Sequence, residues 1–216
     1  MYHRDTPLKR LKLILFLIFL IFVVGVAKDL FLQLLLQNGI TQATGLRTSV
    51  ATLHFSLLSS HAEAKEILLY NPKDFEDPIF ARISDLFFEI DPLALLKGEP
   101  HFLESQFVLE ELFLIKNRSG VSNVARLMNT VSQRGGEGKT PLQIDRLDFA
   151  VLRIITKNYQ TSPPTVREFY PDIHHERLEG LQGLRAAVHG VLSKTLTHPS
   201  VSSLAATEFG DLQEKR

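Results

Sequence analysis

Cysteine is absent from the 216 residues of this chain, and neither sign of charge is in excess, because 24 Lys and Arg residues balance 24 Asp and Glu residues. The lack of cysteine excludes disulfide scaffolds, thiolate zinc sites, cysteine nucleophiles and iron–sulfur clusters. The zero net charge gives no reason to expect nucleic acid or another polyanion as a partner. The composition, with 44% apolar and 22% charged residues, is typical of a folded globular domain and argues against a wholly disordered or fibrous chain.

Most of the apolar excess lies before residue 40. Residues 13–27 read LILFLIFLIFVVGVA, and after Lys28 and Asp29 the run resumes as LFLQLLL up to Leu36. At 1.5 Å per residue, a helix over 13–36 is roughly 36 Å long, which is enough to cross a hydrocarbon core of about 30 Å. The run therefore predicts a transmembrane helix.

Basic residues precede this run and predict its orientation. Four of them, Arg4, Lys9, Arg10 and Lys12, are opposed only by Asp5. Such a tail is expected to stay in the cytoplasm, so that the rest of the chain is exported.

Two other interpretations of the segment stay open. A cleaved signal peptide also has a basic start, a short apolar core and small residues such as Gly25 and Ala27. Apolar residues that continue to Leu36 are unusual for the start of a mature chain. A buried helix of a soluble domain is the third interpretation, although such domains rarely need so pure an apolar run.

Strand patterns follow one another after Gly45, separated by turn residues. In RTSVATLHFSLL, the alternation places Ala51, Leu53 and Phe55 on one face. A second run, AEAKEILLY, ends at Asn71-Pro72, and a third over residues 79–91 places Leu86, Phe88 and Ile90 on one face. The segment 61–116 that contains these runs holds five basic and twelve acidic residues, as expected for a solvated sheet face.

The strand expected over residues 102–116 carries apolar residues on both faces, so both faces are expected to be covered at least in part. Further strands are expected at 142–156 and 165–178. Short helices are expected at 123–132 and 184–195, and a helical turn is expected after Pro92. The predicted fold is α+β: an N-terminal transmembrane helix followed by a small antiparallel β-sheet domain with two short helices.

These expectations divide the chain into four parts. They are a cytoplasmic basic tail (1–12), the transmembrane helix with its periplasmic extension (13–44), a β-rich periplasmic domain (45–196) and a polar, disordered tail (197–216).

Several of these segments occur in the order used by the AsmA-like family of bacterial envelope proteins. The strongest match is the strand followed by NPKDFEDP, at Asn71, Pro72 and Phe75, and then by a strand ending in IDPLALLKG. GVSN before the short helix, at Gly120, Ser122 and Asn123, comes next. The chain resembles the short members of this family over residues 10–196. The resemblance implies a membrane helix, antiparallel β-structure and a role in envelope biogenesis or lipid transport.

No segment carries a recognisable catalytic or ligand-binding pattern. GGEGKT at 135–140 differs from a phosphate-binding loop because Gln133 stands where that loop needs glycine, and it follows a helix. His174, His175 and Glu176 are neighbours in a strand and point to alternate faces, so they cannot converge on one ion. We predict no catalytic, cofactor-binding or metal-binding residues and no enzymatic activity.

The predicted function is that of a binding or scaffold protein, anchored in the bacterial inner membrane by a single pass, with its N-terminus in the cytoplasm and its domain in the periplasm. The expected partners are the lipid bilayer, and also lipid acyl chains or other envelope proteins, but neither nucleic acid nor nucleotide. The alternative is an accessory subunit of a larger membrane protein complex.

Overall fold

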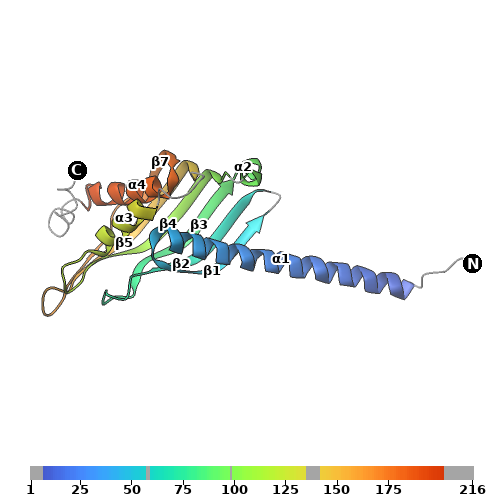
Figure 1. Ribbon diagram of the computed structural model, residues 1–216, viewed down its shortest axis with the longest axis horizontal. Helices are drawn as coiled ribbons and strands as arrows, with labels where there is room; N and C mark the ends of the chain where they lie inside the picture. Colours follow the sequence, from blue (N-terminus) through green and yellow to red (C-terminus); the bar gives the residue numbers. More distant parts are fainter. Residues whose placement is uncertain (1–6, 57–58, 98, 135–141, 202–216) are drawn as a thin grey trace, which may run out of the picture.

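The computed structural model describes residues 7–56, 59–97, 99–134 and 142–201. These residues form one seven-stranded sheet and four helices (Figure 1). The strands are β1 (Arg47–Ser56), β2 (His61–Tyr70), β3 (Ile79–Ile90), β4 (His101–Lys116), β5 (Gln143–Asn158), β6 (Thr165–Phe169) and β7 (Ile173–Gln182). The helices are α1 (Pro7–Thr44), α2 (Pro92–Leu96), α3 (Asn123–Arg134) and α4 (Gly183–Thr197). The glycine-rich segment 135–140 and the predicted tail from residue 202 onward lie outside the described residues.

The sheet is mixed, whereas the sequence predicted an antiparallel one. Its order is β1-β2-β3-β4-β5, with both β6 and β7 paired to β5. All pairs are antiparallel except β4 with β5, which run parallel. Helix α3 joins these two strands as a crossover, which returns the chain to the same end of the sheet. The strand predicted at 165–178 is two strands, separated at Pro171, which has no backbone N–H to donate.

The predicted transmembrane helix is wrong. Among the described residues, no helix is long and apolar enough to cross a membrane. Residues 7–44 do form one helix, but its second half is part of the folded domain: Leu32 and Leu36 pack on β1 and β2, and polar side chains from Lys28 onward bind β1. The single-pass anchor in the inner membrane, and the cytoplasmic and periplasmic sides deduced from it, are corrected by the same finding.

The core lies on one face of the sheet. Helix α1 packs on β1, α3 packs on β4, and α4 packs on β5 and β7. Buried side chains of α3 and α4, Val124, Leu127, Val131 and Leu192, join Leu109, Leu112 and Ile154 of the sheet in the main cluster. Because α1 also contacts α3, these helices form one layer on the sheet, which we call the helix-covered face. The opposite side is called the open face.

One row of residues breaks the alternation of every strand from β1 to β5. Core-facing residues normally recur every two positions, but at this level they are three apart, as in Val50 and Leu53 of β1 or Leu109 and Leu112 of β4. The extra residues are Ala51, Glu66, Ser84, Glu110 and Leu152, and the register of β3 with β4 shifts where Ser84 and Glu110 lie on either side of the Ile83–Leu109 pair. Glu66 has a positive φ of 52°. Since each strand carries the same insertion, the strands stay paired on both sides of the row.

This row changes which residues share a face. Ala51 is exposed and does not lie with Leu53 and Phe55, as the alternation predicted. In β4, Leu112 and Leu114 face the same side as Leu109, whereas Phe113 and Ile115 face the open side. The expectation that this strand is covered on both faces is confirmed, because Leu114 and Ile115 are 1% and 0% exposed.

Candidate functional site

Helix α1 turns its polar side chains toward the sheet. Lys28 and Gln33 donate hydrogen bonds to the backbone carbonyls of Phe55 and Val50, and Gln37 donates to Val50 at 3.4 Å. Asp29 Oδ1 accepts from the backbone N–H of Phe55 at 3.3 Å. These side chains satisfy the backbone groups of β1 that point away from β2, so they cover an edge that would otherwise be free.

Burial and hydrogen bonding act in opposite directions on Asp29. Burial raises the pKa of this carboxyl group, but the hydrogen bonds from Lys28, from the Phe55 N–H and from His54 bring the pKa below its usual value. Asp29 is therefore a carboxylate at neutral pH. It forms an ion pair with Lys28 at 3.2 Å and lies 3.3 Å from His54 Nδ1.

The outer side of α1 is apolar and exposed. Four large side chains on this side of the docked half are between 51% and 61% exposed: Leu30, Phe31, Leu34 and Leu35. Further toward the N-terminus, where α1 projects beyond the sheet (Figure 1), the exposed set continues with Leu15, Phe16, Leu17 and Phe19. A helix on a water-soluble domain normally buries its apolar side and exposes its polar side. In α1 the side toward the sheet carries polar groups as well as Leu32 and Leu36, and the exposed side carries these eight large apolar residues, which we call the outer apolar face.

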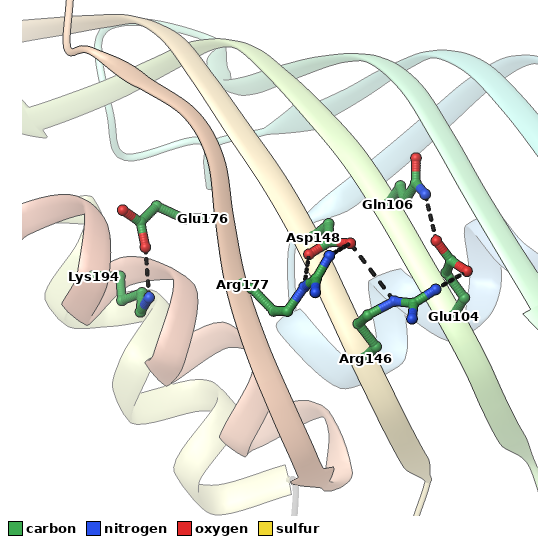
Figure 2. A network of polar contacts seen from close by, with 7 residues as sticks. All are labelled: Glu104, Gln106, Arg146, Asp148, Glu176, Arg177 and Lys194. Carbon is green, nitrogen blue, oxygen red and sulfur yellow. Dashed lines mark hydrogen bonds and ion pairs between the residues drawn. The ribbon is translucent and has the colours of Figure 1, made fainter.

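A chain of ion pairs crosses the open face near the outer strand β7 (Figure 2). Arg146 of β5 pairs with Glu104 of β4 and lies 3.7 Å from Asp148. Asp148 in turn accepts two hydrogen bonds from Arg177 of β7, at 2.7 and 3.1 Å. The hydrogen bond from Arg177 is the main cause that lowers the pKa of Asp148, while burial opposes it and the charges of Arg177 and Arg146 add to it. We call this chain the charge ladder.

A second set of charges surrounds Glu111, which is only 8% exposed. Arg82 of β3 binds it at 2.7 Å, and Arg153 of β5 binds its other oxygen. Beside this group, the row of extra residues leaves an open depression of about 330 Å³, lined by residues that include Ser49, Glu66 and Glu110. Both guanidinium groups are already engaged with the carboxylate, so the depression offers no free charge pattern that would select a ligand.

The motif residues that carried the family resemblance meet at one end of the sheet. Asn123, at the start of α3, is 1% exposed; its Oδ1 accepts from the Ile115 N–H at 2.9 Å and its Nδ2 donates to the Phe113 carbonyl at 2.7 Å. The same Nδ2 donates to Asn71 Oδ1 at 3.1 Å. Asn71 then donates to the carbonyls of Asp77 and Ile79. These residues hold the 71–78 loop to β4 and α3, which is a structural role.

The residues weighed as metal ligands do not converge. His174 pairs with Asp172 at 2.9 Å, and both His174 and His175 line a small depression beside Asp148. Over the described residues, no group of three His, Cys, Asp or Glu side chains could hold a metal ion. The polar side chains that α1 turns toward β1 were the signal that sequence reasoning missed. The two glutamines and the charged pair within the apolar run could have indicated contact with a sheet edge.

Comparison with known proteins found no match to any family model, curated protein or solved structure.

Proposed function

We propose that this protein is a non-catalytic binding or scaffold module that binds lipid acyl chains through the outer apolar face of α1 and serves in lipid handling. One observation carries the proposal: polar side chains of α1, together with Leu32 and Leu36, contact the sheet, while eight large Leu and Phe side chains of the same helix stay exposed. Burying apolar surface contributes about 25 cal/mol per Å², so eight exposed Leu and Phe side chains favour an apolar partner strongly.

The chemistry of the outer apolar face favours acyl chains over a polar ligand. Its members are only Leu and Phe, and Lys28, Asp29 and Gln33 of the docked half are engaged with β1. A ligand with hydrogen-bonding groups would leave those groups unpaired against this surface, which costs about 1–3 kcal/mol for each group. The resemblance to AsmA-like proteins agrees with a role in lipid handling and belongs to the same proposal.

The test is flotation of the full chain with phosphatidylcholine vesicles on a density gradient. Phe31→Glu/Leu34→Glu is expected to reduce the vesicle-bound fraction at least tenfold, because two charges would enter the apolar contact. Leu93→Glu/Val166→Glu, which places two charges at exposed apolar positions outside α1, is the matched control and should float like the wild type. Circular dichroism should show the same helix content in all three proteins.

The alternative function, an accessory subunit of a larger complex, predicts a different result. A protein partner retained in fixed stoichiometry and lost in Phe31→Glu/Leu34→Glu, together with wild-type chains that do not float, would overturn lipid binding in favour of a subunit role.

A further inference from the structure

We propose that two copies of this chain pair edge to edge through β7, in an antiparallel arrangement whose two-fold axis passes at Leu178. The proposal concerns the edge of the sheet that lies opposite the edge covered by α1, and it does not depend on lipid binding.

The outer edge of β7 is open to pairing. Strand β7 pairs with β5 on one side, and no other strand among residues 7–56, 59–97, 99–134 and 142–201 pairs with its second side. An unpaired strand edge presents a row of N–H and C=O groups, which is a template for another strand. At the other end of the sheet, side chains of α1 cover the corresponding edge of β1. Only one of the two long edges is therefore protected by the chain itself.

The charges of β7 are arranged to complement a second copy of the same strand. Arg177 and Glu179 lie two residues apart, opposite Asp148 and Arg146 of β5, so both side chains are on the open face. In an antiparallel pair centred on Leu178, each Arg177 lies opposite the partner's Glu179, and Leu178 lies opposite itself. Cross-strand pairs of opposite charge stabilise a sheet, while like charges destabilise it.

The charge ladder then continues across the interface. Within one chain it alternates from Glu104 through Arg146 and Asp148 to Arg177, which is the last member of the charge ladder (Figure 2). Glu179 is exposed and makes no ion pair with the described residues, although its charge is close enough to act on Arg177. The partner's Glu179 provides the next negative charge in the series. If the charges on β7 served only to prevent pairing with another strand, charges of a single sign would be sufficient.

The first experiment is sedimentation equilibrium of the full chain in a mild detergent, which keeps the outer apolar face of α1 covered. We expect a reversible dimer that weakens as salt is added. In Glu179→Arg, the new arginine lies opposite the partner's Arg177, and this pair of like charges occurs twice in each dimer. The dissociation constant should therefore rise at least tenfold. Glu110→Arg makes the same charge change on the exposed surface of β4, away from β7, and should leave the dissociation constant unchanged.

A second measurement checks the register. Because the chain has no cysteine, Leu178→Cys creates a single thiol that lies about 5 Å from its copy in the proposed pair. Mild oxidation should cross-link Leu178→Cys at least ten times faster than Val166→Cys, an exposed position on β6 that lies far from the two-fold axis. A monomeric wild type, equal dissociation constants for Glu179→Arg and Glu110→Arg, or equal cross-linking rates would overturn the proposal. Pairing of β7 with a strand of a different protein would overturn it as well.

Discussion

Asn71 and Asn123, 52 residues apart in the chain, hydrogen-bond to each other through their side chains at 3.1 Å. The contact joins the loop after β2 to the start of α3, and Asn123 also binds both the N–H of Ile115 and the carbonyl of Phe113. We expect Asn123→Ala to lower the free energy of unfolding by about 2–4 kcal/mol, because it leaves buried backbone groups without partners. Chemical denaturation of the full chain measures this loss.

The neighbouring position provides the control for that substitution. Ser122 contributes only a 3.4 Å contact to the N–H of Ala125. Ser122→Ala should therefore cost about 1 kcal/mol or less. Equal losses for Ser122→Ala and Asn123→Ala would show that the buried network is not what stabilises this end of the sheet.

Glu66 carries backbone strain at the row of extra residues. Its φ of 52° lies in the left-handed region, which costs a residue with a Cβ atom roughly 1–2 kcal/mol and costs glycine almost nothing. The preceding residue, Lys65, is also exposed and pairs regularly with Thr52 and Asp85. We expect Glu66→Gly to be more stable than Lys65→Gly by about 1 kcal/mol or more in thermal unfolding. The same loss in both variants would contradict the assigned strain.

The phenol of Tyr159 is expected to ionise at a higher pH than the tyrosine of an unfolded chain. Burial, and then the hydrogen bond that its hydroxyl donates to Asp77 at 2.6 Å, raise the pKa of Tyr159 to about 12. Since this pKa lies above the value near 10 of an unfolded chain, the contribution to stability is complete below pH 10 and is lost as pH rises toward 12. The ultraviolet absorbance of the wild type minus that of Tyr159→Phe should show one phenol ionising near pH 12. A difference curve centred at pH 10 would refute the contact with Asp77.

The charge ladder should make stability sensitive to acid. The pKa of Asp148 is lowered chiefly by the hydrogen bond from Arg177, so the stabilisation is present above the unfolded pKa of about 4 and is lost as pH falls through the lower folded pKa. Compared with Asp148→Asn, the wild type should be more stable by a constant amount between pH 5 and 7, and this difference should shrink below pH 4. Arg177→Met should reproduce the behaviour of Asp148→Asn, because it removes the guanidinium group. A difference that grows as the solution is acidified would reverse the assigned sign.

Local sequence patterns determined most of the secondary structure. The apolar run, the turn residues around Asn71-Pro72 and the three- and four-residue spacing after Asn123 each depend on neighbours in the chain. The helices at 123–134 and 183–197 and the strands at 47–56, 61–70, 79–90 and 143–158 therefore lie close to where they were predicted. The absence of a recognisable catalytic or metal-binding pattern was also a property of the sequence alone.

Only the tertiary structure decided which faces these elements present. The extra residue in each of five neighbouring strands is tolerated because all five carry it within one register step of the next strand, and no single strand reveals that alignment. The parallel pairing of β4 with β5 depends on where the crossover helix α3 returns the chain. For α1, hydropathy identified an apolar helix, but the sheet edge decided its orientation. The backbone groups of β1 require polar partners, so Lys28, Asp29 and Gln33 turn inward beside Leu32 and Leu36, and Leu30, Phe31, Leu34 and Leu35 are left exposed.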